Sequence, residues 1–202
     1  MKKENMFLYL TAYLALLIPI PGRFVYGFTI MTEVIFLSII GSLSVLIIEK
    51  IKFEQLKSIL FILILVSFSI LFRQIIVMIN PQVALTLGFI FFLPPVSIFI
   101  LNILFTQKSG NFLEQFKHTI FKTLFFSLGG MIIFLIRYIF GYGTFTFFGK
   151  NHFIYEKLLF NENSVGIFSL LASIPGVLII LGIIYFIFIQ ISKKIDILKN
   201  KE

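Results

Sequence analysis

Residues 89–101 have the sequence FIFFLPPVSIFIL, an apolar stretch with two adjacent prolines, Pro94 and Pro95, at its centre. The composition of this stretch is that of a helix buried in a membrane. A proline inside a helix removes a backbone donor and clashes with the preceding turn, at a cost of about 3 kcal/mol or more. The stretch therefore predicts a membrane helix that is interrupted partway across.

The rest of the chain is equally apolar, with 59% hydrophobic residues among 202 and a mean hydropathy of +1.06. A membrane span needs roughly 20 mostly apolar residues. Six segments meet this requirement, at about 6–22, 28–48, 58–79, 83–105, 119–140 and 164–192. No segment alternates with period two over a strand length, which argues against a barrel. These patterns predict an all-α integral membrane protein with a single membrane domain and a basic tail over 193–202.

The first segment has two interpretations. A basic start followed by an apolar core is compatible with a signal peptide, but no A-x-A cleavage pattern follows it. We interpret the segment as a retained span.

Basic residues between the spans predict the orientation. Of 17 Lys and Arg residues, twelve fall on the side of the N-terminus, and Arg23, Lys150 and Lys157 fall on the opposite side. The other two, Arg73 and Arg137, belong to spans. Cytoplasmic loops carry the excess of basic residues, so both termini are expected in the cytoplasm. The net charge of +8 is explained by this bias, and no nucleic-acid partner is expected.

The first predicted span is also interrupted, by Pro19 and Pro21 in LLIPIPG. A division of the chain near residue 82 gives repeats of about 6–80 and 83–192. Each repeat has three spans and begins with an interrupted one, so the repeats run in opposite directions. Such a pair indicates a site at the membrane midplane, here a cradle formed by Pro19, Pro21, Pro94 and Pro95. The alternative is two ordinary proline kinks, with Pro21 merely ending a helix.

Three stretches resemble a known family: LGFIFFLPPVSIFILN (87–102), FLIRYIFGYGTFTFFG (134–149) and VGIFSLLASIPGVLIILGIIYFIFIQISKK (165–194). They are similar to the fourth span, the segment after the fifth span, and the last span of the D/E-type membrane subunits of Rnf and Na+-translocating NADH:quinone oxidoreductase (Nqr) complexes. The resemblance implies two inverted three-helix repeats with broken first and fourth helices, in the plasma membrane (the inner membrane of a bacterium). It also implies a paralogous membrane subunit and other complex subunits as partners.

The chain departs from this family at the cofactor. In the family, cysteines on the two broken helices hold a [2Fe–2S] cluster, but this chain contains no cysteine. Ile18 stands before Pro19 in place of the first ligand, and Ile98 or Ile100 stands in place of the second. No cofactor is therefore expected on this chain alone, and its role would be that of a non-catalytic subunit. The runner-up function is a small-solute or ion transporter built on the inverted repeat.

Three charged residues in the spans are further candidates. Charges within a membrane are costly and are often functional, so Glu33, Arg73 and Arg137 could line an ion path. The structural alternatives are a Glu33–Arg73 ion pair near the outer side, and an Arg137 side chain that extends to the outer interface. Tyr138 stands where the family has Glu after this Arg.

The remaining polar motifs favour structural roles. Gly141 and Gly143 suggest a turn at a helix end, and Gly129–Gly130 suggests close helix packing. His118 and His152 are expected in loops, without partners at metal-ligand spacing, so no metal site is predicted. Residues 141–163 are expected to form an interfacial or re-entrant loop. No nucleophile–base pair or phosphate loop is present in the sequence, so no catalytic residue is assigned.

Overall fold

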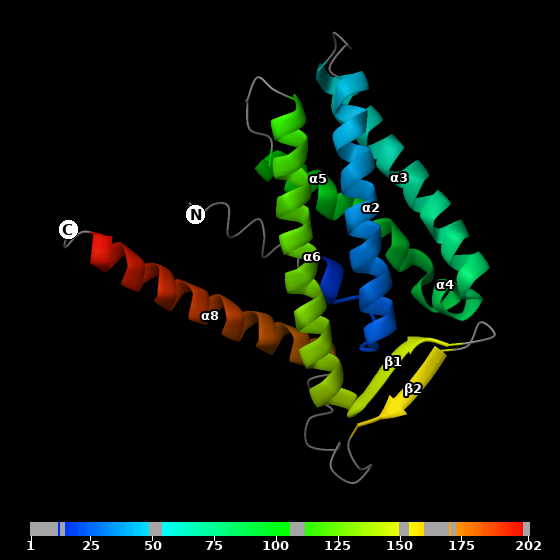
Figure 1. Ribbon diagram of the computed structural model, residues 1–202, viewed down its shortest axis with the longest axis vertical. Coiled ribbons are helices and arrows are strands. Elements are labelled where there is room, and N and C mark those ends of the chain that lie inside the picture. The colour runs from blue at the N-terminus through cyan, green and yellow to red at the C-terminus, as the bar shows by residue number, and fades with distance from the viewer. Residues whose placement is uncertain are drawn as a thin grey trace.

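The computed structural model describes residues 12, 15–48, 54–105, 112–149, 154–159, 170 and 173–199, and most of these are helical (Figure 1). The helices are α2 (Phe24–Ile48), α3 (Glu54–Ile79), α4 (Pro81–Leu87), the 3-10 helix η1 (Gly88–Phe92), α5 (Leu93–Phe105), α6 (Phe112–Tyr142) and α8 (Ile174–Lys199). Two short strands, β1 (Thr144–Phe148) and β2 (Ile154–Leu158), lie between α6 and α8 in the chain.

Four helical stretches in the described part of the chain are long and apolar enough to cross a membrane: Phe24–Ile48, Leu56–Ile79, Pro81–Phe99 and Leu113–Tyr142. They correspond to the second, third, fourth and fifth predicted spans, so the prediction of a mostly helical fold with membrane-length apolar helices is confirmed, although the described residues also contain two strands. Residues 6–11, 13 and 14 of the predicted first span and the beginning of the sixth span lie outside the described residues. A shorter apolar stretch, Ile174–Ile187, forms the first part of α8.

Helix α2 lies at the centre of the bundle and packs against α3, α5 and α6. Two glycines allow α2 and α6 to approach closely. A Cβ atom on Gly27 would collide with the Phe134 ring, and one on Gly130 would collide with the Met31 side chain. The prediction of close packing at Gly129–Gly130 is therefore confirmed at Gly130.

The predicted interruption of the fourth span is present, but it lies before the prolines. Helix α4 ends at Gly88, whose φ of +41° is a conformation that glycine adopts readily, and η1 continues to Phe92. Pro94 and Pro95 then occupy the first turn of α5. Helix N–H groups are unpaired in a first turn, so prolines are tolerated there. The prolines therefore start a helix, and the prediction that they break one midway was wrong in this detail.

The turn between α3 and α4 is explained by its sequence. The Asn80 side chain accepts a hydrogen bond from the Val83 N–H at 3.1 Å, and Pro81 occupies the first position of α4. Asn is a favoured N-cap and Pro a favoured first residue, so this pair starts α4 directly after α3.

The segment after α6 was expected to be a loop, and the structure shows an antiparallel hairpin there. Thr144 pairs with Leu158, and Phe148 pairs with Ile154. Gly143, with φ of +63°, follows the end of α6, so the predicted turn at this helix end is confirmed. The expectation that no segment alternates with period two is wrong here, since Thr and Phe alternate over the first four residues of TFTFF.

Helix α8 has a different environment from the other long helices. Figure 1 shows that it starts beside the lower end of α6 and runs outward, away from the bundle. Near its start Val177, Ile180 and Leu181 are buried, but further along Ile183, Phe186 and Ile187 are exposed. Lipid or another protein could cover this surface.

Candidate functional site

The first interrupted segment is held by Arg137. Residues 15–17 are helical and residues 18–20 form a turn, so the carbonyl groups at this helix end have no partners within the helix. The Arg137 guanidinium donates hydrogen bonds to the Ile20 carbonyl at 2.9 Å and to the Leu17 carbonyl at 3.3 Å. A cation placed at a helix C-terminus also interacts favourably with the helix dipole.

This arrangement corrects one interpretation of Arg137. The residue is only 3% exposed, so its side chain does not extend to the outer interface. It points instead into the bundle, where backbone carbonyls replace the water that an exposed guanidinium would bind. Arg137 therefore links α6 to the segment that precedes α2.

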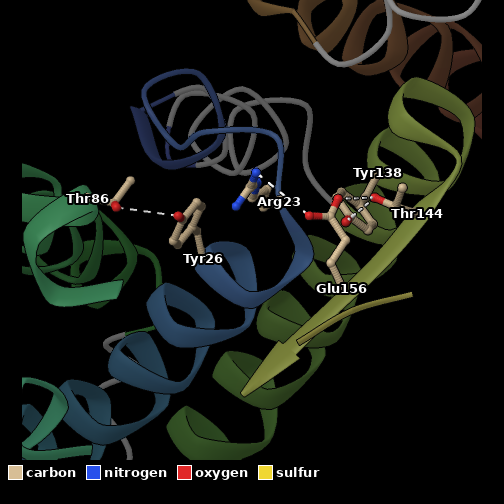
Figure 2. A network of polar contacts seen from close by, with 6 residues as sticks. All are labelled: Arg23, Tyr26, Thr86, Tyr138, Thr144 and Glu156. Atoms are coloured by element: carbon tan, nitrogen blue, oxygen red, sulfur yellow. Dashed lines mark hydrogen bonds and ion pairs between the residues drawn. The ribbon is translucent and has the colours of Figure 1, made fainter. Parts of the chain in front are cut away.

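A polar network covers this region from the side of the hairpin (Figure 2). The Tyr138 hydroxyl makes a short hydrogen bond with the Thr144 hydroxyl, which donates to Glu156 Oε1 at 3.0 Å. Glu156 also lies 3.9 Å from the Arg23 guanidinium. The network therefore connects the end of α6, both strands and the turn before α2.

Contacts between aromatic rings add to this cover. The Phe145 ring lies 5.2 Å from the Phe24 ring, and the Phe147 ring lies 5.5 Å from the Phe28 ring, measured between centroids. Phe24 and Phe28 are one turn apart on α2. The hairpin therefore packs along the first two turns of α2.

The second interrupted segment is held by Ser69, on α3. Its hydroxyl oxygen lies 2.6 Å from the carbonyl oxygen of Phe91, in η1. It also lies 2.8 Å from Oε1 of Glu33, on α2. Glu33 and Ser69 are both 0% exposed. We call these three groups the acid–hydroxyl–carbonyl chain, because they connect α2, α3 and the break in the fourth span.

Glu33 makes no ion pair with Arg73 in the described part of the chain, so the expected Glu33–Arg73 pair is not formed. The second carboxyl oxygen, Oε2, is buried and has no hydrogen-bond partner there. Arg73 lies one turn beyond Ser69 on α3 and is partly exposed, and its Nε is buried without a partner. Glu33 is thus a buried carboxyl group with one neutral partner, Ser69.

The predicted cradle residues occupy different environments. Pro19 is exposed and Pro21 partly exposed, whereas Pro94 and Pro95 are buried. Of the positions that replace the cluster ligands, Ile98 is buried, and Ile18 packs against the core from a partly buried position. Ile100 lies in α5. That the two interruptions face one another across a shared cradle stays a prediction.

No group of three potential metal ligands occurs among the described side chains. His118 lies in α6 and not in a loop, which corrects that expectation, and His152 lies outside the described residues. The polar groups that the structure brings together are therefore oxygen atoms and the guanidinium groups of Arg23 and Arg137, which suit a proton or a hard cation better than an electron carrier.

Sequence reasoning missed Ser69 and the Phe91 carbonyl. Ser69 lies within FILILVSFSILF, where a serine has no distinguishing neighbour, and a backbone carbonyl has no sequence signal at all. Glu33 was found because it is the one acidic residue among nine that falls inside a predicted span.

The fold is mostly helical, with four apolar helices long enough to cross a membrane, and the site is a buried carboxyl group beside an interrupted helix. Comparison of the chain with known protein families, curated proteins and solved structures finds no match.

Proposed function

We propose that this chain is an integral membrane subunit of an ion-translocating electron-transport complex similar to the Rnf and Nqr complexes. In this proposal it forms part of the membrane core and contributes to the ion path, while other subunits carry the electrons. The observation that carries the proposal is the acid–hydroxyl–carbonyl chain, in which buried Glu33 reaches the break in the fourth span through Ser69. Carboxyl groups buried within membrane proteins and interrupted helices are both features of ion pathways.

The family resemblance supports the electron-transport part of this proposal, and the course of α8 supports the presence of partners. A helix that leaves the bundle with exposed Ile183 and Phe186 offers a surface to a neighbouring membrane subunit. A paralogous subunit is the partner that the resemblance implies. The six-span inverted repeat with both termini in the cytoplasm belongs to the same proposal.

The test is purification of the tagged chain from its own membranes in a mild detergent. The proposal expects subunits that bear flavin or iron–sulfur clusters to co-purify, and a Phe186→Glu substitution on α8 to reduce their recovery. Glu114→Gln, at an exposed position near the start of α6, is the matched control. Recovery of the chain without any redox subunit would contradict the proposal.

A second function, transport of an ion or small solute by the chain alone, is favoured by one observation. Glu33, Ser69 and Phe91 all belong to this chain, so one subunit supplies every group of the candidate site found among the described residues. Ion flux into liposomes that contain only the purified chain would support this function. Flux that requires co-purified redox subunits would support the first.

Orientation is tested independently, and the absence of native cysteine makes labelling simple. Cysteine at Lys157, an exposed residue of β2, should react with a membrane-impermeant reagent added from outside. Cysteine at Lys52 or Lys199 should react only after the membrane is opened. The reverse pattern would overturn the proposed topology.

A further inference from the structure

The acid–hydroxyl–carbonyl chain contains one hydrogen fewer than its geometry requires if Glu33 is ionised. The Ser69 oxygen lies 2.8 Å from a carboxyl oxygen and 2.6 Å from a carbonyl oxygen. Both are hydrogen-bonding distances. A carbonyl oxygen and a carboxylate oxygen are both acceptors, and a serine hydroxyl has a single hydrogen to donate. One of the two contacts would then place two oxygen atoms together without a hydrogen between them.

A proton on Glu33 supplies the missing hydrogen. The carboxylic acid O–H donates to Ser69 Oγ, and the Ser69 hydroxyl donates to the Phe91 carbonyl. Glu33 Oε1, Ser69 Oγ and the Phe91 carbonyl oxygen then each have a suitable partner, and the buried site carries no net charge. We infer that Glu33 is a proton-binding site of this protein, and that its proton determines whether the Phe91 carbonyl in the interrupted helix keeps its hydrogen bond.

The surroundings of Glu33 suit a proton better than a metal cation. The contacts found for the site are two side-chain groups and one backbone carbonyl, whereas Na+ and Mg2+ prefer several oxygen ligands or retained waters. The carboxyl Oε2 has no partner among the described residues. An ionised carboxylate with one neutral donor would be expensive to bury, but a neutral acid is far less so.

Ionisable groups on the neighbouring elements do not neutralise Glu33. No ionisable side chain occurs in α4, η1 and α5, which together span residues 81–105, and none occurs in β1. Helix α6 meets α2 where Gly130 faces Met31 and Phe134 faces Gly27. Residues 123–136 of α6, which include these contacts, also contain no ionisable side chain. On α2 itself the ionisable residue nearest to Glu33 along the chain is Tyr26, and on α3 the one nearest to Ser69 is Arg73. Neither is joined to Glu33 by a hydrogen bond or an ion pair that the described residues form.

Loss of the proton changes the backbone contact. A carboxylate attracts the Ser69 hydrogen more strongly than a neutral carbonyl does, because hydrogen bonds to ionised acceptors are roughly twice as strong. The single hydroxyl hydrogen would turn to Glu33, and the Phe91 carbonyl would lose its donor. Gain or loss of one proton is thus coupled to the stability of η1. That this proton is the translocated ion rests on the proposed function, but its binding at Glu33 does not.

Infrared spectroscopy of the purified full chain tests the inference, because a protonated carboxyl has a C=O stretching band that a carboxylate lacks. We expect this band at neutral pH, with an area of one carboxyl group per chain. It should disappear in Glu33→Gln, in which the amide can still donate to Ser69, and should remain in the surface variant Glu114→Gln. Removal of the hydrogen-bond partner in Ser69→Ala should shift the band without abolishing it.

Three results would overturn the inference: no band in the wild type, a band unchanged in Glu33→Gln, or a band unmoved in Ser69→Ala. A band removed by sodium ions at constant pH would overturn the choice of a proton as ligand in favour of Na+. If Glu33→Gln does not fold, the wild-type area and the Ser69→Ala shift still decide. Failure of redox subunits to co-purify would contradict the proposed function but would not affect the inference of a proton-binding site at Glu33.

Discussion

The two interrupted segments solve one backbone problem in different ways. At residues 17–20 the carbonyl groups at a helix end receive hydrogen bonds from Arg137, whose charge is permanent. At residues 88–92 the Phe91 carbonyl receives its hydrogen bond from Ser69, which is shared with an acid that can lose a proton. Unpaired backbone groups cost several kcal/mol each in a membrane interior, so neither segment can be left without a donor. The difference indicates that the backbone contact at the first break is permanent and that the contact at the second break depends on a proton. We call residues 17–20 with Arg137 the fixed joint, and residues 88–92 with Ser69 and Glu33 the adjustable joint.

Removal of the fixed donor should have the largest effect on stability. Arg137→Met keeps most of the side-chain volume but leaves the Leu17 and Ile20 carbonyls without donors. We expect a loss on the order of 3 kcal/mol, because hydrogen bonds to charged groups contribute about 1.5–3 kcal/mol each. The loss is measured as a lower melting temperature of the helical circular dichroism signal in detergent, since the chain has no tryptophan for fluorescence.

Arg137→Lys is the matched control for that variant. It retains the charge with a less extended group of donors, so its melting temperature should lie between those of the wild type and Arg137→Met. Equal melting temperatures of all three proteins would contradict the claim that Arg137 stabilises the first break.

The packing of α2 against α6 positions both joints, because Arg137 is on α6 and Glu33 is on α2. Gly27→Ala should cost about 1–3 kcal/mol, since its Cβ meets the buried Phe134 ring, which has little room to move. Gly130→Ala should cost less, because the flexible Met31 side chain can move aside. Thermal melting of the two variants checks the order, and the reverse order would show that the helices pack differently.

Removal of the adjustable donor should have a smaller effect than loss of Arg137. Ser69→Ala leaves the Phe91 carbonyl and Glu33 unpaired, at a cost of about 1–3 kcal/mol. Ser67→Ala is the control, because Ser67 is exposed on the same helix and its hydroxyl bonds only its own helix, at the Leu63 carbonyl. If Ser69→Ala and Ser67→Ala had the same melting temperature, the contact at Phe91 would contribute nothing to stability.

The cover over the first joint should contribute least. Arg23 and Glu156 are 42% and 41% exposed in their side chains and 3.9 Å apart. Exposed ion pairs contribute about 0–1 kcal/mol, so Arg23→Gln should change the melting temperature little and should do so less at high salt. A large salt-independent loss would mean that Arg23 helps to hold the break itself.

The sequence predicted the helical class and four of the spans, because long apolar runs separated by polar residues have few alternatives. It also indicated interruptions near Pro19 and Pro94, but it put the second one at the prolines. The actual break depends on the positive φ of Gly88, and several isolated glycines in the spans look alike in the sequence. The hairpin was missed because aromatic residues near a membrane interface also suit a loop.

The candidate site was predicted only in part. Glu33 and Arg137 were singled out because charges are rare inside spans, but their partners could not be inferred. Arg137 bonds carbonyl groups more than a hundred residues away in the chain, and Glu33 bonds a serine that resembles any other serine in a membrane helix. The Glu33–Arg73 pair was expected from opposite charge and similar depth in the spans, and the fold instead placed a hydroxyl group next to the acid.

Hydrogen–deuterium exchange at several pH values tests the contrast between the two joints most directly. After correction for the intrinsic pH dependence of exchange, protection of the amides of residues 88–93 should fall when Glu33 loses its proton. Protection of residues 15–23 should stay constant, and neither segment should respond in Glu33→Gln. A loss of protection shared by both segments, or a constant protection of residues 88–93 while the carboxyl band disappears, would contradict the account.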